Sequence, residues 1–120
     1  MVTAAKIITA LVAIEHLYFM YFEMFAWETI GKHTFRSLPA HLFEPTKVLA
    51  ANQGLYNGFL SAGLIWSLLV TDSVWSKNIA LFFLGCVAVA GIYGGFSASK
   101  KIFVFQAIPA LVAIVLWVLA

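Results

Sequence analysis

Charged residues are scarce in this chain of 120 residues, at 10% of the sequence against about a quarter in a soluble domain. Cysteine is scarcer still: Cys86 is the only one, which excludes an internal disulfide and a CxxC redox centre. The net charge of +2 is small, and the sequence contains no basic run, no Gly-rich phosphate loop and no Cys/His zinc pattern. We therefore expect no nucleic-acid partner.

Hydrophobic residues make up 63% of the chain and are gathered in long runs. Each run reaches the roughly 20 residues that a helix needs to cross a bilayer. The sequence predicts an all-α membrane protein, with four transmembrane helices in an up-down bundle that forms one domain over residues 1–120. The four apolar segments are Val2 to about Ile30, about Pro45 to Val70, about Val74 to Gly95, and about Lys101 to Ala120.

The basic residues predict how these spans are oriented. An even number of spans places both termini on one side, with Lys6 and Lys77. The opposite side then carries Lys32, Arg36, Lys47, Lys100 and Lys101. The positive-inside rule makes the side with more basic residues cytoplasmic. We expect a multi-pass protein of the bacterial plasma (inner) membrane, with the lipid bilayer as its first partner and both termini outside.

The connection from Gly31 to Glu44 is longer than most loops between bundle helices. Phe35, Leu38 and Leu42 recur there at a helical spacing, which predicts a short helix in the membrane interface. Pro39 limits its length. Pro45 suits the first turn of the second span.

Polar residues interrupt the spans at a few positions, where an unpaired charge costs about 2.5–3.5 kcal/mol or more. Since successive spans run in opposite directions, counting inward from the cytoplasmic ends brings most of these residues to the cytoplasmic half of the bundle. Glu15 and His16 are expected near the midplane, below the others. The outer half holds few polar groups, so a blunt pocket fits better than a pore. The candidate ligand-binding residues are Glu15, His16, Glu23, Gln53, Asn57, Tyr93 and Gln106.

Each candidate also has a structural interpretation. Glu15 and His16 are candidate catalytic groups, or could be held by amides of a neighbouring helix. Glu23 could pair with Lys47 or Arg36, and Gln53 and Asn57 could be hydrogen-bonding links between helices. Two carboxylates and an imidazole can bind a metal ion, but Glu15 and His16 point in different directions and the second Glu-x-x-His of di-iron bundles is absent. We expect no metal site, and the sequence leaves any cofactor open.

Glycine and alanine recur four residues apart in the second and third spans. Gly54 and Gly58 form one such face, and Gly91 and Gly95 form another. Small residues at this spacing let helix backbones approach closely. We expect one face to pack within the bundle and the other to favour a homodimer.

Several strings resemble a known family. They are Glu15-His-Leu-Tyr18, Glu23-Met-Phe-x-Trp27, Lys47 to Leu60, Ala90 to Gly95, and Gln106-x-x-Pro-Ala110. The chain resembles, over essentially its whole length, a family of small bacterial four-helix membrane proteins named the domain of unknown function number one thousand three hundred and four. The resemblance implies the four-span bundle and supplies no activity.

The pattern of polar residues favours a binding protein, with a cytoplasm-facing cavity that takes a small or amphiphilic molecule. Gln53, Asn57 and Gln106 would orient the ligand, tyrosines would line the walls, and Glu15 and His16 would form an ionisable floor. Three alternatives stay open. They are a membrane enzyme that transfers protons on a lipid-like substrate, a proton-coupled exporter, and a structural accessory subunit.

The orientation can be tested with a cysteine introduced at Thr34 in a chain whose Cys86 is replaced by serine. We expect a thiol reagent that cannot cross the membrane to miss this cysteine in intact cells and to label it after the cells are opened. Efficient labelling in intact cells would reverse the orientation.

Overall fold

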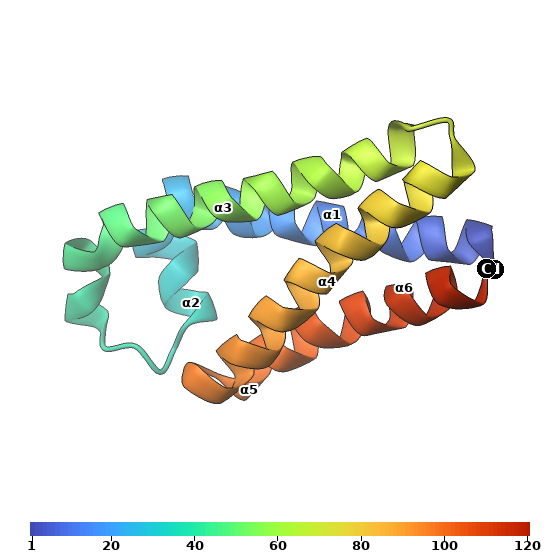
Figure 1. The fold of residues 1–120 in the computed structure, drawn as a ribbon. Coiled ribbons are helices and arrows are strands. Elements are labelled where there is room, and N and C mark those ends of the chain that lie inside the picture. Colours follow the sequence, from blue (N-terminus) through green and yellow to red (C-terminus); the bar gives the residue numbers. More distant parts are fainter. The chain divides into compact units, whose positions relative to one another are not determined.

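The computed structural model describes residues 1–120 and consists of helices and turns, without a strand (Figure 1). The long helices follow the apolar runs of the sequence, which confirms the all-α prediction. In chain order the elements are α1 (Val2–Phe25), a π turn (Trp27–Gly31), α2 (Lys32–Thr34), a 3-10 turn (Ala40–Leu42), α3 (Phe43–Leu69), α4 (Ser73–Ser97), α5 (Lys100–Ile102), a second π turn (Phe103–Ala107) and α6 (Ile108–Leu119).

Three helical stretches are long and apolar enough to cross a membrane: α1, α4 and the continuous stretch Lys100–Leu119. This agrees with a multi-pass membrane protein. The remaining predicted span, from about Pro45 to Val70, corresponds to α3, which has 27 residues but carries the amides Asn52, Gln53 and Asn57 in its apolar sequence. These amides lower its hydropathy, so a count of four spans is not confirmed.

Several helix ends follow from local chemistry. Asp72 caps α4, as its carboxylate accepts hydrogen bonds at 3.0 Å from the backbone N–H groups of Val74 and Trp75. Pro45 lies in the first turn of α3, where its missing N–H costs nothing. The first span ends earlier than Ile30, because Ala26 leaves the helical conformation with φ −140° and ψ 30°.

The loop between α1 and α3 is less helical than its apolar spacing predicted. α2 ends at Thr34, and Pro39 has the extended conformation, with φ −55° and ψ 139°. A proline disfavours helical backbone at the residue before it, so a helix from Phe35 to Leu42 cannot form. Phe35, Leu38 and Leu42 are nonetheless all half-buried.

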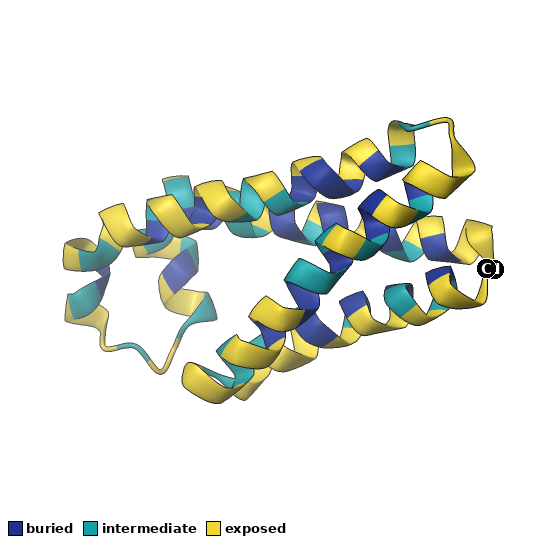
Figure 2. Cartoon of the chain, viewed as in Figure 1, coloured by how far each residue is buried: buried dark blue, intermediate teal, exposed yellow.

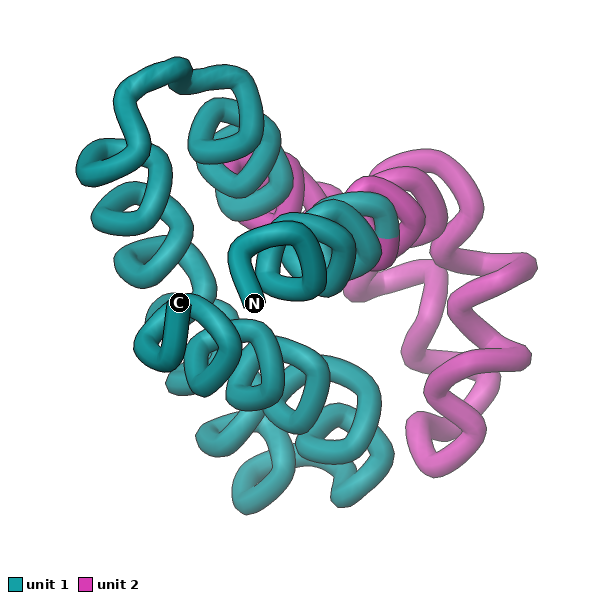
Figure 3. Tube along the Cα trace, turned by 90° about the vertical axis from the view of Figure 1, so that its right-hand side faces the viewer, with its two compact units in different colours: residues 1–14, 60–120 teal, residues 15–59 magenta.

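The chain divides into two compact units (Figure 3). Unit 1 contains Met1–Ile14 and Leu60–Ala120, and unit 2 contains Glu15–Phe59. Both α1 and α3 therefore contribute one part to each unit. Each unit has its own buried side chains, and most of the remaining apolar surface is exposed, as in a protein whose solvent is lipid (Figure 2).

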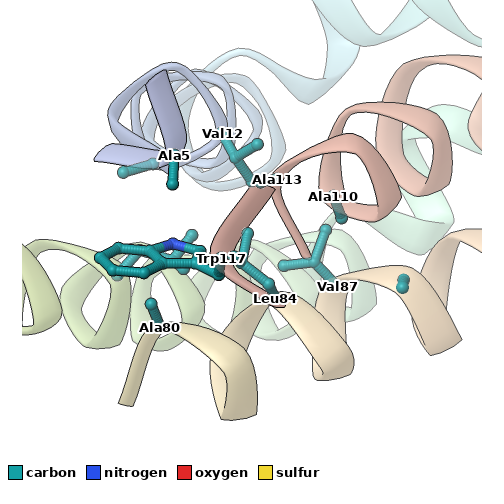
Figure 4. Close-up of a cluster of buried hydrophobic side chains, with 11 residues drawn as sticks. Ala5, Val12, Ala80, Leu84, Val87, Ala110, Ala113 and Trp117 are labelled. Carbon is teal, nitrogen blue, oxygen red and sulfur yellow. The ribbon is translucent and has the colours of Figure 1, made fainter. Parts of the chain in front are cut away.

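The core of unit 1 takes small and branched side chains from α1, α3, α4 and α6 (Figure 4). Leu84 and Val87 of α4 are fully buried, and Ala110 and Ala113 of α6 lie in the same cluster. Alanine at these positions lets helices approach closely, which is the usual packing of helices in lipid.

Buried polar groups of unit 1 are satisfied within the unit. The indole nitrogen of Trp117 donates to the hydroxyl of Thr9 at 2.9 Å, and that hydroxyl donates to the carbonyl of Ala5 at 2.7 Å. The Ser61 hydroxyl donates to the carbonyl of Ala13 at 2.8 Å. These bonds pair the two hydroxyls and the indole N–H.

The predicted glycine faces both pack inside the chain. In unit 1, a Cβ at Gly91 would lie 2.5 Å from the backbone nitrogen of Ala107. In unit 2, a Cβ at Gly54 would lie 2.8 Å from Cγ of Met24, and one at Gly58 would lie 2.7 Å from Sδ of Met20. Both glycine faces are therefore used for packing within the chain, and neither is available to a second copy.

The close approach at Gly91 predicts a difference between two glycines of the same helix. Gly91→Ala should lower the free energy of unfolding by about 1–3 kcal/mol, because backbone atoms cannot move aside as a flexible side chain can. Gly85→Ala is the matched control. A Cβ there meets nothing within 4 Å, so alanine should leave stability unchanged or raise it by up to about 1 kcal/mol. Thermal unfolding in detergent measures both, and equal effects would contradict the packing.

Candidate functional site

Glu23 is the centre of a hydrogen-bonded cluster in unit 2. It is only 2% exposed, and each of its carboxylate oxygens accepts a hydrogen bond from an amide of α3. Gln53 Nε2 donates to Oε2 at 2.7 Å, and Asn57 Nδ2 donates to Oε1 at 2.5 Å. Gln53 and Asn57 are four residues apart, so both amides lie on one helix face. The Glu23 cluster, formed by these three residues, links the unit 2 parts of α1 and α3.

Lys47 and Arg36, the alternative partners proposed for Glu23, interact with other groups. Lys47 Nζ lies 3.9 Å from Oε1 of Glu28, and both side chains are about half exposed. A pair of this kind contributes little to stability. Arg36 donates from Nε to the carbonyl of His33 at 3.2 Å. Glu23 is thus held by neutral amides and not by a basic residue.

Glu15 and His16 form a second pair in unit 2, and their environment is unlike that of Glu23. His16 is fully buried and packs edge-on against Phe19, with ring centroids 5.1 Å apart. Its Nδ1 lies 3.9 Å from Oε1 of Glu15, too far for a hydrogen bond. Oε1 of Glu15 is buried without a hydrogen-bond partner, although the side chain as a whole is 25% exposed.

An unsatisfied buried acceptor of this kind costs about 1–3 kcal/mol. Native proteins keep few such groups, and each calls for an explanation such as a water, an ion or a ligand. The Glu23 cluster shows that amides of this chain can satisfy a buried carboxylate fully. Glu15 has not been satisfied in that way, and this makes it the best candidate for contact with a bound molecule.

Tyr93 and Gln106 belong to unit 1. Tyr93 lies on α4 and is 72% exposed. Gln106 is half-buried in the π turn Phe103–Ala107, which precedes Pro109. Single π turns are frequent at functional sites, but the role of either residue in ligand binding stays a prediction. Tyr18, Tyr21 and Tyr56 are exposed as well.

Two open hollows lie elsewhere in unit 2. One, of about 370 Å³, is lined by residues 24–29 together with Lys47, Val48 and Ala51. The other, of about 510 Å³, is lined by residues 32, 33, 36–40 and 43. Neither touches Glu15 or His16, so the tyrosine-walled cavity above this pair stays a prediction. No group of three or more His, Cys, Asp or Glu side chains gathers as metal ligands would.

One further arrangement, centred on Trp27, was not predicted from the sequence. Its indole nitrogen donates to the Thr46 hydroxyl at 3.0 Å, and its ring lies 5.5 Å from Phe35 and 5.0 Å from Phe43, centroid to centroid. The Thr46 hydroxyl in turn donates to the carbonyl of Leu42 at 2.7 Å. The one available signal was Thr46 in the first turn of α3, where a hydroxyl can bond to the start of the helix.

Comparison with known proteins decides the family. The family described as "Protein of unknown function (DUF1304)" matches residues 10–118. The chain belongs to the DUF1304 family. It is 33% identical over 113 residues to "Uncharacterized protein YpaA" of Lactococcus lactis subsp. lactis (strain IL1403), a match that covers 91% of this chain and 92% of that protein.

The resemblance predicted from the sequence is therefore confirmed. No solved structure matches the chain. Neither the DUF1304 family nor this relative carries a named activity, so the function of the DUF1304 chain has to be argued from its own residues.

The Glu23 cluster predicts how stability responds to loss of an amide. Gln53→Leu and Asn57→Leu should each lower the free energy of unfolding by about 1–3 kcal/mol, because each leaves one carboxylate oxygen of Glu23 buried without its donor. Asn52→Leu is the control, since the exposed Asn52 amide bonds only to the carbonyl of Val48 in its own helix. It should change stability by less than about 0.5 kcal/mol. Three equal effects in thermal unfolding would show that the cluster does not hold the helices.

Proposed function

We propose that this DUF1304 protein binds a small or amphiphilic molecule within the membrane, at a site reached from the cytoplasmic side. Glu15 and His16 form the ionisable floor of the site. The unpartnered Oε1 of Glu15 carries the proposal. A carboxylate oxygen accepts hydrogen bonds, so the ligand brings a donor such as an ammonium, hydroxyl or amide group.

The surroundings of the pair indicate the rest of the ligand. His16 packs on Phe19, and neighbouring residues such as Ile14 and Leu17 of α1 are exposed. A molecule that reaches Glu15 through this apolar environment needs an apolar body beside its donor group. An amphiphile with one polar end satisfies both requirements.

The Glu23 cluster has a different part in this proposal. Gln53 and Asn57 already donate to Glu23, so they position α1 against α3 in unit 2 and do not need a ligand to be satisfied. Tyr93 and Gln106 belong to unit 1, and a part for them in ligand binding stays a prediction from the sequence.

We also propose that α3 is the fourth span of a single domain. Its 27 residues extend about 40 Å at 1.5 Å per residue, enough to cross the hydrocarbon core. Two of the amides that lower its hydropathy are paired with Glu23, which removes much of the cost of placing them in lipid. Both termini belong to unit 1 and lie close together (Figure 3), which suits an even number of spans.

The basic residues orient this bundle in the bacterial plasma membrane with both termini outside. A homodimer stays a proposal, and it needs a surface other than the glycine faces, which pack within the chain.

Native mass spectrometry of the detergent-purified protein tests the binding site. We expect the wild-type protein to retain a non-protein mass that Glu15→Leu and His16→Ala lose. Glu15→Leu should be as stable as the wild type or more so, because a group kept for binding is held at a cost to folding. His16→Ala should be less stable, because it removes a fully buried ring that packs against Phe19. Glu44→Gln, which changes an exposed carboxylate, should retain the mass.

The variant Glu15→Gln separates two ligand classes. The glutamine carbonyl still accepts a hydrogen bond, so a neutral donor would remain bound, whereas an ammonium group would lose its ion pair and be released. If the wild type retains no additional mass, or if all variants retain it equally, the proposed binding site is wrong.

A further inference from the structure

The hollow of about 510 Å³ in the loop of unit 2 has a chemistry distinct from that of Glu15 and His16. Its lining includes the basic residues Lys32, His33 and Arg36 and the apolar residues Leu38, Pro39 and Ala40. Its volume lies within the range of small-molecule sites. Basic and apolar groups thus share one concave surface beside α2 and the start of α3.

The backbone of the loop sets the position of the basic groups. The N–H of Phe35 bonds to the carbonyl of Gly31 at 2.8 Å, which closes the last helical turn. The Arg36 side chain folds back over that turn, as Nε donates to the carbonyl of His33 at 3.2 Å. Since this bond uses only Nε, the two terminal nitrogens of the guanidinium keep their donors for a ligand.

The charge of the hollow is not compensated by the protein. Neither Lys32 nor Arg36 takes part in an ion pair, and no acidic side chain lines the hollow. Glu28 is paired with Lys47, and Glu44, which follows Phe43 in the sequence, is not among the residues that line the hollow. The hollow therefore presents two cationic groups and an imidazole, a combination that suits an anion with several oxygens.

The place of the hollow in the chain indicates which anion this is. The spanning helix α1 ends at Phe25, and the hollow is formed by the residues that follow it and by the first residue of α3. Residues at the end of a span lie at the level of the lipid headgroups. Leu38 is half-buried, and Pro39 and Ala40 are exposed, so the hollow offers an apolar wall to glycerol and the first acyl carbons beside the phosphate.

We propose that Lys32, His33 and Arg36 bind the phosphate of an anionic phospholipid in this hollow. A free phosphate ion would use the basic groups alone, whereas a lipid also uses the apolar wall. A zwitterionic lipid would bring a quaternary ammonium group towards two cations. The inference is independent of the binding site proposed at Glu15, and either can fail without the other.

The test measures lipid retention by the full-length protein in detergent micelles, with native mass spectrometry. Phosphatidylglycerol and phosphatidylcholine are added separately. We expect the wild type to retain phosphatidylglycerol at least about tenfold more tightly, as two basic groups at a membrane surface would give. Lys32→Gln combined with Arg36→Gln should remove this preference and leave the melting temperature unchanged, because both side chains are exposed.

The matched control is Lys100→Gln combined with Lys101→Gln, which removes the same charge from another exposed basic pair. It should keep the preference. Arg36→Lys should weaken it partly, because lysine keeps the charge and loses the planar fork that binds phosphate through two nitrogens. If the control loses as much of the preference for phosphatidylglycerol as the variant with Lys32→Gln and Arg36→Gln, binding depends on net charge and the proposed site is wrong.

Competition with inorganic phosphate distinguishes a site for a lipid headgroup from a site for a free phosphate ion. This experiment needs only the wild-type protein. A large molar excess of inorganic phosphate should leave phosphatidylglycerol bound, because the ion cannot replace contacts with the apolar wall. Complete displacement by phosphate, or equal retention of the two lipids by the wild type, would overturn the proposal.

Discussion

Within unit 2, the packing of α1 against α3 depends on the buried carboxylate of Glu23. Glu23 is almost entirely removed from solvent, and a carboxylate in that position is tolerated only when its oxygens accept hydrogen bonds. Gln53 and Asn57 supply them, and this need explains why α3 carries more amides than the other long helices. Gly54 belongs to the same arrangement: a Cβ there would lie 3.0 Å from Cβ of Glu23, so the missing side chain lets the amides reach the carboxylate.

The two acidic residues inside α1 illustrate different uses of a polar group in an apolar environment. Glu23 has two donors and acts as a link between helices. Glu15 has one buried oxygen with none, although it lies only eight residues earlier in the same helix. A satisfied network specifies the structure, whereas an unsatisfied group is retained against its cost. The loop adds a third arrangement, in which Lys32 and Arg36 remain unpaired because they are exposed.

Much of this structure could be predicted from local sequence. The apolar runs predicted each long helix to within a few residues, and Pro45 was correctly expected in the first turn of α3. Counting depth along alternating spans brought Glu23, Gln53 and Asn57 to one level, where the structure places their hydrogen bonds. These predictions succeed because hydrophobic burial and capping depend on nearby residues.

What the sequence could not predict depends on side-chain geometry. The Trp27–Thr46 bond goes together with the packing of one indole against Phe35 and Phe43, and composition does not reveal this. A double-mutant cycle between Glu23→Leu and Asn57→Leu tests the central claim most directly. Unfolding free energies should show a coupling of about 0.5–3 kcal/mol, with the double variant more stable than Asn57→Leu alone, because no orphaned carboxylate remains. Additive effects would contradict the account.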